Sequence, residues 1–307
     1  MFVFLKDKTS DVTRSIDQQL RSFELHNVFN PSIVEKGDRR FVAFRAALNA
    51  DDRPFRFFLC VSDAAGNLME GPADLGADFA SLNLPAVSDP KLFTLGDEVW
   101  AAINTGHFET PNRIFVKRIY PHASRPIECR FDRRGAIEKN WGFFLLNDEL
   151  FCLYMLNPLT ILRCVDRHAE HWEFVAHPDW APLHNRKLPS LTIGPQPIVT
   201  DSASGPIMHV IAHQRFVLLR KRTYLGRALG ITLSGTPQIT SVGPLLAHSP
   251  VSMLGSRIRH NRNLISCTYF SGLRISEGRA LLSYGINDTD FNLAETSYED
   301  IGFKKTT

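Results

Sequence analysis

The sequence predicts an all-β protein: a five-bladed β-propeller in which the whole chain, residues 1–307, forms one domain. One pattern recurs along the chain: a polar residue beside Pro, Trp or Gly opens an apolar strand, and after a tight turn a second apolar strand returns. The copies begin about 50 to 60 residues apart, which is the period of propeller blades built from β-hairpins. Five units fit this length, and their polar starts should converge at one end of a central channel.

The clearest copy begins at Val87 and places Asp89 directly before Pro90. Proline fixes its own φ and biases the preceding residue towards extended backbone. We therefore expect Asp89 to hold a defined, extended pose at the entrance of a strand. Gly96 and Asp97 then supply the turn of a β-hairpin.

Other copies of the pattern begin at Asn30, Asn140 and Gln196, and a fainter one spans residues 255–269. In each copy, apolar residues run into a turn rich in Gly, Asp, Asn or Ser and continue beyond it. These repeats define the inner hairpins of the expected blades.

Before the first copy, residues 2–5 predict a short strand and residues 15–20 a helical turn, which is the only helix expected. The first blade is expected at 28–62. The Gly-, Ala- and Asp-rich residues 66–86 predict a loop that leads back to the axis.

The second blade is expected at 89–119, and the third begins with a hairpin at 139–158 that continues through 161–165. Residues 166–193 contain His, Trp and Pro without periodicity, and predict the longest irregular segment of the chain.

The fourth blade is expected to start at Gly194, with an outer strand at 228–233, and the fifth near Pro250. Residues 280–301 carry two more strands, which should close the ring against the first blade. Propellers close by joining their chain ends, which removes exposed sheet edges.

Composition excludes several classes of protein. The chain is 44% hydrophobic and 22% charged, as in globular proteins. A net charge of +3 and short, scattered basic clusters argue against nucleic acid as a partner, and no RNA-binding or zinc-finger pattern occurs.

Cysteine usage and hydropathy predict a cytoplasmic protein. Five cysteines, an odd number, lie mostly within apolar runs and are expected to be buried free thiols in a reducing compartment. The apolar start, residues 1–5, is too short for a signal peptide. No apolar run approaches the ~18 residues of a membrane span.

The four histidines between residues 168 and 184 raise the question of a metal site. His168 and His171 lack the i,i+4 spacing of a helical metal motif, so a solvated loop is the better interpretation. We expect no metal and no cofactor.

Six short motifs, in order and at blade spacing over residues 28–301, resemble those of the five-bladed propeller enzymes that act on β-mannosides. That superfamily comprises mannosylglucose and mannooligosaccharide phosphorylases with their hydrolase and mannosyltransferase relatives. The matching segments are Asn30-Pro31-Ser32, Ser88-Asp89-Pro90-Lys91, Glu138-Lys139-Asn140, Gly194-Pro195-Gln196-Pro197, Tyr224-Leu225-Gly226, and Ser283-Tyr284-Gly285-Ile286-Asn287-Asp288.

The resemblance implies an enzyme that makes or breaks a glycosidic bond of a β-mannoside-like substrate, by glycosyl transfer or hydrolysis with inversion. Asp89 matches the catalytic aspartate and would be the acid or base, with Asp288 as a second carboxylate. The expected substrate-binding residues are Asn30, Arg45, Lys91, Lys139, Asn140, Asn157, Gln196, His213, Tyr224 and Tyr284.

One departure from the motifs bears on the reaction. The phosphorylases end their third hairpin in His-Arg-Pro, and that arginine helps to hold phosphate. This chain has Leu156-Asn157-Pro158 instead. Because a bidentate phosphate donor is lost, phosphorolysis is doubtful. The expected partner is a sugar or oligosaccharide, and a sugar phosphate or nucleotide-sugar also fits.

Other interpretations remain open at this stage. Asp89 before a proline also suits a strand cap, and Asp288 also suits an Asx-turn. The chain would then be a catalytically silent glycan-binding propeller, or a scaffold that binds protein. An enzyme requires that the polar residues at the blade starts meet in one cavity, whereas a scaffold does not.

Overall fold

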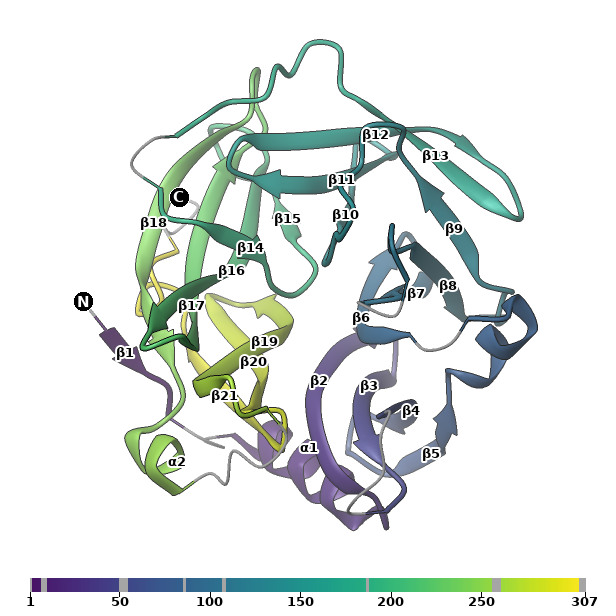
Figure 1. Cartoon of the computed structure of the whole chain (residues 1–307), viewed down its shortest axis with the longest axis vertical. Helices are drawn as coiled ribbons and strands as arrows, with labels where there is room; N and C mark the ends of the chain where they lie inside the picture. Colours follow the sequence, from purple (N-terminus) through teal and green to yellow (C-terminus); the bar gives the residue numbers. More distant parts are fainter. Residues whose placement is uncertain are drawn as a thin grey trace.

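A computed structural model describes residues 2–6, 10–49, 55–84, 87–106, 109–185, 188–255 and 261–303. Strands dominate this part of the chain, and they lie in curled sheets around a central axis (Figure 1). The predicted all-β class is therefore confirmed. Helical structure in the described residues is limited to α1 (Asp11–Ser22), the 3-10 helix η1 (Ala77–Leu82) and α2 (Pro250–Gly255).

The first sheet is a four-stranded antiparallel meander in the order β2-β3-β4-β5. Alternate side chains of β3 enter two different clusters: Phe41 packs towards β6 and β7, while Val42 and Phe44 pack towards β21. Because side chains alternate across a strand, one strand supplies the core on both faces of its sheet. The strands are β2 (His26–Lys36), β3 (Arg39–Ala47), β4 (Arg56–Asp63) and β5 (Leu68–Asp74).

The next two meanders join into one eight-stranded sheet, because their outer strands β9 and β13 pair in parallel. Trp100 and Trp172 pack at the junction with ring centroids 4.9 Å apart. The strands are β6 (Ser88–Leu95), β7 (Glu98–Asn104), β8 (Ile114–Tyr120), β9 (Ile127–Arg130), β10 (Gly142–Leu146), β11 (Glu149–Leu156), β12 (Leu159–Arg167) and β13 (His171–Ala176).

The C-terminal strands form two further meanders, linked by parallel pairing of β17 with β19. The N-terminal strand β1 (Phe2–Phe4) adds in parallel to β18. The remaining strands are β14 (Leu191–Ile193), β15 (Ile198–Thr200), β16 (Ile207–Leu218), β17 (Lys221–Thr232), β18 (Gln238–Ala247), β19 (Leu264–Ser276), β20 (Arg279–Ile286) and β21 (Asp290–Ser297).

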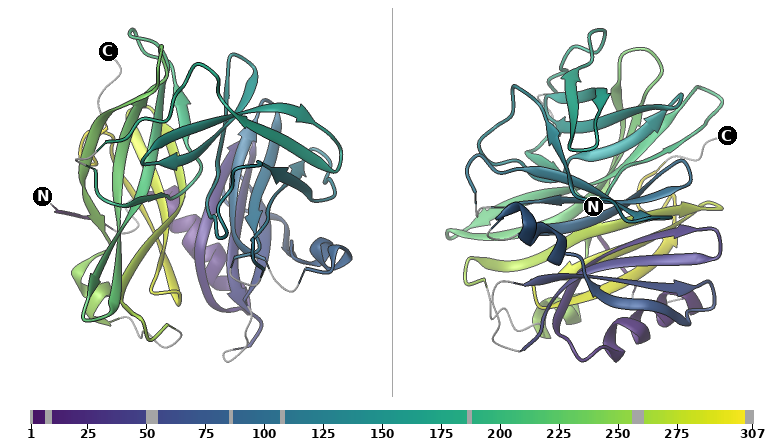
Figure 2. Two further views of the ribbon diagram at one scale, coloured as in Figure 1. Left: turned by 45° about the horizontal axis from the view of Figure 1, so that its top comes forward. Right: turned by 90° about the vertical axis from the view of Figure 1, so that its right-hand side faces the viewer.

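The last strands of the chain, β19 to β21, pack against β2 (Figure 1 and Figure 2). Phe291 and Leu293 share a cluster with Val42 and Phe44, and the Ser271 hydroxyl donates to the Pro31 carbonyl at 2.6 Å. Among the described strands, β21 pairs with β20 but not with β2. The C-terminal segment thus meets the first sheet through side-chain packing, and no strand is shared there.

Several local expectations were wrong. The predicted loop at 66–86 contains β5 and η1, and the irregular segment at 166–193 contains β13. The predicted helical turn is a three-turn helix, because Ser10 caps it and Ile16 and Leu20 bury one face. The helix α2 was not expected at all.

The sequence predicted buried free thiols and no apolar run long enough to span a membrane. All five cysteines are free thiols, and four of them are buried. Within the part of the chain that the structure describes, no helix combines the length and apolarity needed to cross a bilayer.

Candidate active site

Four polar residues in or next to the strands β2, β6, β10 and β20 share one unusual backbone conformation. Asn30, Asp89, Asn140 and Asp288 have φ of 52°, 54°, 64° and 59°. This left-handed region is strained for most residues but is tolerated by Asn and Asp. The backbone of Asp89 therefore has the left-handed conformation, and the expectation of extended backbone there was wrong.

The strand ladders are interrupted at two of these positions. The β2–β3 register shifts between Phe29 and Ser32, around Asn30, and the β6–β7 register shifts between Ser88 and Lys91, around Asp89. Bulges of this kind re-aim a side chain away from its usual alternation. Both side chains consequently face a cavity at the axis.

This cavity has a volume of about 350 Å³. It brings together most of the residues that the sequence singled out, and adds several that it did not. The predicted residues that line it are Asn30, Arg45, Asp89, Lys139, Asn140, His213, Tyr224 and Asp288. The additional polar residues in its wall are Thr192, Arg222, Asn261 and Tyr269.

An ion pair lies in the cavity. Arg45 Nη1 donates to Asp89 Oδ1 at 3.0 Å, with only 18% and 10% of the two side chains exposed. The guanidinium also lies over the rings of Phe29 and Phe55, at 4.9 and 5.5 Å from their centroids. These contacts fix the arginine, and through it the carboxylate.

The two carboxyl groups of the cavity have pKa values displaced in opposite directions. Burial alone would raise the pKa of Asp89, but the positive charges of Arg45, Lys139 and Lys91 outweigh it and lower the pKa. Burial raises the pKa of Asp288, and the Asp89 charge adds to this effect against the attraction of Arg45. Asp89 is thus held as a carboxylate, and Asp288 keeps its proton to higher pH.

Two buried polar atoms in the wall lack a hydrogen-bond partner within the described chain: Asn30 Oδ1 and Arg45 Nε. Native structures satisfy nearly all such atoms, so those that remain call for an explanation.

His213 lines the cavity and is also hydrogen-bonded to the chain. Its Nε2 accepts a hydrogen bond from the backbone N–H of Phe270 at 2.8 Å, and its ring lies 4.3 Å from that of Tyr269. Burial lowers the pKa of His213 to about 3, so the imidazole is neutral. Because Nε2 is already occupied, His213 is suited to donate from Nδ1 and not to act as a base.

Asn140 is a positioning residue as well as part of the wall. Its Nδ2 donates to the Ile193 carbonyl at 2.7 Å, and its Oδ1 accepts from the Tyr269 hydroxyl at 3.2 Å. Asn140 thereby connects the third meander to β14 and orients Tyr269 at the cavity.

Lys91 lies beneath the cavity and does not line it. The side chain is only 2% exposed, and its Nζ donates to the Gly194 carbonyl. Burial lowers the pKa of Lys91 to about 7, against the attraction of Asp89. Lys91 therefore acts on the site through its charge beside Asp89, and direct contact with a substrate is not supported.

Three other predicted residues lie away from the cavity. Gln196 accepts from the Phe143 N–H at 2.6 Å, and donates to the Trp141 carbonyl at 3.0 Å. Asn157 exchanges two hydrogen bonds of 3.1 Å with the backbone of Asn185, and Tyr284 is fully buried in a core cluster. Each side chain is used to hold the fold together, so substrate contact is not supported.

The additional residues of the wall gave weak signals in the sequence. Arg222 belongs to one of the short basic clusters, which gave no indication of a site, yet it is half-buried at the cavity. Asn261 and Tyr269 lie in the faintest copy of the repeat, where the hairpin pattern is hardest to recognise.

The histidine-rich segment contains His168, His171, His177 and His184. No cluster of three or more potential metal ligands occurs among the described residues. His177 instead stacks on Trp180, with ring centroids 3.9 Å apart.

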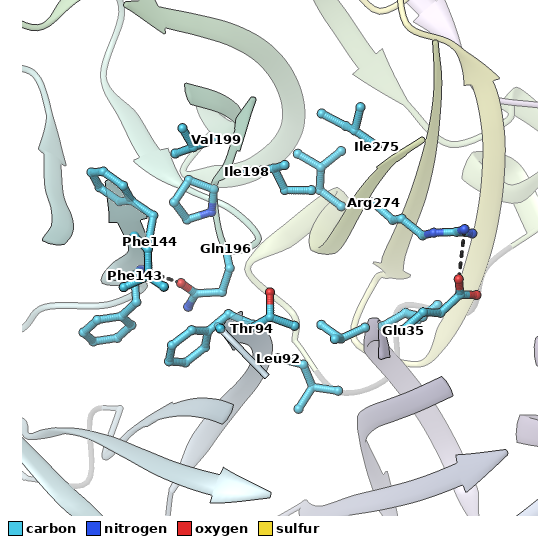
Figure 3. Close-up of a pocket in the computed structure, with 17 residues that line it drawn as sticks. Glu35, Leu92, Thr94, Phe143, Phe144, Gln196, Ile198, Val199, Arg274 and Ile275 are labelled. Atoms are coloured by element: carbon cyan, nitrogen blue, oxygen red, sulfur yellow. Dashed lines mark hydrogen bonds and ion pairs between the residues drawn. The ribbon is translucent and has the colours of Figure 1, made fainter. Parts of the chain in front are cut away.

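A second cavity, of about 440 Å³, lies further along the same inner strands (Figure 3). Strand β2 contributes Asn30 to the first cavity and residues 33–35 to the second, and the other inner strands divide similarly. Most residues of the second wall are apolar, among them Phe143 and Ile198. At its edge Arg274 pairs with Glu35 at 2.9 Å.

We expect Gly194→Ala to destabilise the fold by about 1–3 kcal/mol, the usual cost of overpacking. A Cβ at this position would lie 2.3 Å from the Ile211 carbonyl oxygen, which is backbone and cannot easily move. Urea unfolding followed by fluorescence measures the change. Gly135→Ala is the control, because its Cβ would meet nothing closer than 3.6 Å; an equal loss in both variants would contradict the prediction.

No family model and no curated protein matches the chain. Solved structures do match over nearly its whole length. One belongs to family GH130, described as mannoside phosphorylases that include glycoside hydrolases targeting β-1,2 mannosidic linkages in Candida mannan. It has a TM-score of 0.63 and 11% identity, and the match covers 92% of this chain and 87% of that one.

Two other solved structures also match most of the chain. A β-1,2-mannobiose phosphorylase from Listeria innocua has a TM-score of 0.56 and 11% identity over 90% of this chain and 91% of its own. A mannose phosphorylase from Leishmania mexicana, in complex with phosphate, has a TM-score of 0.51 and 13% identity. The match covers 94% of this chain and 95% of that one. The chain shares their fold. It is a distant structural relative of these proteins, as the sequence motifs predicted.

Proposed function

We propose that the chain is a carbohydrate-active enzyme that breaks a β-mannoside-like glycosidic bond, in a cavity on the axis of a five-bladed propeller. The whole chain, residues 1–307, forms the single domain of this proposal. The meanders β2–β5, β6–β9, β10–β13, β14–β18 and β19–β21 are the proposed blades. The shared fold with mannoside phosphorylases and hydrolases supports the choice of substrate class.

The observation that carries the proposal is the presence of two carboxyl groups, displaced oppositely in pKa, in one cavity. Inverting cleavage needs an acid that protonates the leaving oxygen and a base that activates the attacking water. Asp288 is suited to carry the proton and Asp89 to accept one from water. Environments that separate two carboxyl pKa values are the usual way in which such roles are assigned.

The attacking group can be water or phosphate. The sequence argued against phosphate because Asn157 replaces an arginine, but Asn157 lies outside the cavity. Within the described chain, no carboxylate forms an ion pair with Lys139 or Arg222, and both line the cavity. We therefore keep phosphorolysis as a second candidate beside hydrolysis. Glycosyl transfer from a nucleotide-sugar finds no support in the three structural relatives.

The test is incubation of the protein with β-manno-oligosaccharides, with and without inorganic phosphate, and chromatography of the products. Free sugar without phosphate identifies a hydrolase, and a sugar 1-phosphate identifies a phosphorylase. Substrate binding without any turnover would leave the alternative of a silent glycan-binding propeller. Absence of both binding and turnover over a broad sugar panel would contradict the proposal.

Arg45→Ala should weaken sugar binding at least about tenfold, because it removes a charge-assisted donor and unpairs a buried carboxylate. Isothermal titration calorimetry with a manno-oligosaccharide measures the affinity. Arg133→Ala is the matched control, since Arg133 is exposed in a turn. Equal affinities of the two variants would argue against this cavity as the binding site.

We also propose a cytoplasmic location, on the basis of the free cysteines. Cell fractionation of the untagged protein tests it.

A further inference from the structure

The hairpin formed by β16 and β17 has the longest uninterrupted antiparallel pairing among the described strands (Figure 1). The two strands pair without interruption from Ile207 with Thr232 to Leu218 with Lys221. Leu219 and Arg220 form the two-residue turn, with φ of 50° and 62°. Two consecutive positive φ values are typical of a type I′ turn, which closes a tightly twisted hairpin.

The tip of this hairpin exposes a continuous run of apolar side chains. Phe216, Val217, Leu218 and Leu219 are 37%, 62%, 64% and 88% exposed. Successive residues of a strand point to opposite faces, so both faces of the tip are apolar and neither is covered. Four consecutive exposed apolar residues are unusual on a soluble surface and indicate a site of interaction.

Positive charge surrounds these apolar residues. Arg215 precedes the run, and Arg220 and Lys221 follow it, all three exposed. The sequence contains no acidic residue between positions 214 and 230. Within the described chain, no carboxylate forms an ion pair with any of the three cations.

We propose that the β16–β17 tip inserts its apolar residues into an anionic lipid surface, with Arg215, Arg220 and Lys221 binding the headgroups. Apolar insertion and attraction of cations to acidic lipids are the two forces that hold peripheral proteins on membranes. The hairpin pairing already satisfies the backbone groups of the tip, which matters because lipid offers no hydrogen-bond partners.

A second copy of the chain is a poorer occupant. If two tips packed against each other about a two-fold axis, the same three cations of each copy would face one another. A partner groove on one face would also leave the apolar residues of the opposite face in water. A lipid surface takes up both faces at once.

The hairpin tip lies close along the chain to residues of the cavity. Arg222 and Tyr224 lie at the beginning of β17, only a few residues from the tip, and both line the cavity. A tip seated on a membrane would therefore hold the cavity beside the lipid surface.

The test is co-sedimentation of the full chain with sucrose-loaded vesicles, made either of phosphatidylcholine alone or with about one third phosphatidylserine. We expect binding to the anionic vesicles that weakens as salt is added. Leu218→Glu combined with Leu219→Glu should lower the partition coefficient at least about tenfold, since it removes apolar area and adds negative charge.

The matched control combines Leu68→Glu with Met69→Glu, which alters an equally adjacent pair on β5, 48% and 45% exposed. This control should bind vesicles like the wild type. Circular dichroism should show that both double variants are folded, because the substituted side chains are exposed and lie outside the core.

Three results would overturn the proposal. One is no vesicle binding by the wild-type chain at either composition, and another is unchanged binding by the Leu218→Glu, Leu219→Glu variant. The third is a dimer, detected by light scattering, that this variant dissociates without any effect on vesicles. That last result would assign the tip to contact between copies of the chain.

Discussion

Asp89→Asn should lower turnover by about two to four orders of magnitude, the usual contribution of an acid or base catalyst. Asparagine keeps the size of the side chain and its ability to accept from Arg45 Nη1, 3.0 Å away. It loses the negative charge and with it the capacity to take up a proton. The measurement is kcat on the substrate identified by the product analysis.

The same substitution should cost about 1–3 kcal/mol of unfolding free energy, because the charged Arg45 guanidinium then donates to a neutral amide oxygen instead of a carboxylate. The lowered pKa of Asp89 determines the direction in which stability changes with pH. Its contribution to stability is present above the unfolded-state pKa, and is lost as pH falls through the lower pKa of the folded state. The wild type and the variant should thus converge in stability at low pH.

Asp97→Asn is the matched control for both measurements, since Asp97 occupies the turn of the same hairpin with 99% of its side chain exposed. If Asp89→Asn retained full activity and lost only stability, Asp89 would be a strand cap and not part of a catalytic pair.

The repeat of hairpins, the polar residues at their starts and the convergence of these residues could be predicted from the sequence. Asn30, Asp89 and Asn140 were found because each opens a copy of the pattern, and all three line one cavity. The pattern could not predict their left-handed backbone, since the bias of a residue before proline points to extended structure.

Contacts between distant segments were beyond prediction because they depend on the complete ring. Tyr284 and Gln196 look like site residues in their motifs, yet one fills a core cluster and the other binds the backbone of β10. Arg222 reaches the cavity only because β17 pairs in parallel with β19, which no local pattern indicates.

Parallel pairing of the outer strands was missed for the same reason. Strands β9 and β13 are short and lie more than 40 residues apart in the chain. Hydrophobic alternation identifies such strands one at a time but carries no information on which edges meet. The boundaries of the sheets therefore required the structure.

Asp288→Asn should reduce turnover by about two to four orders of magnitude, in the same range as Asp89→Asn, because it removes the proposed proton donor. Its effect on stability should be the opposite. Burial and the Asp89 charge raise the pKa of Asp288 in the folded state, so folding disfavours the ionised form. Asparagine cannot ionise, and the variant should therefore be more stable than the wild type at neutral pH.

The pH dependence separates this effect from a general change in packing. Below the ordinary aspartate pKa of about 3.8, Asp288 is protonated in both folded and unfolded chains and costs nothing. As pH rises, the unfolded chain releases this proton near the ordinary pKa, whereas the folded chain keeps it until the higher folded-state pKa. The wild type therefore loses stability relative to the variant as pH rises through the folded-state pKa. Urea unfolding of both proteins at pH 3.5 and pH 7.5, values at about the two ends of this range, measures the divergence.

Asp300→Asn, at an exposed position, is the control and should change neither activity nor stability. An Asx-turn role for Asp288 predicts the reverse pattern: lower stability at all pH values, with activity retained. Because kcat/KM reports on groups of the free enzyme, Asp288→Asn should also remove the fall in wild-type kcat/KM at high pH. A variant that kept this alkaline limb would show that another group carries the proton.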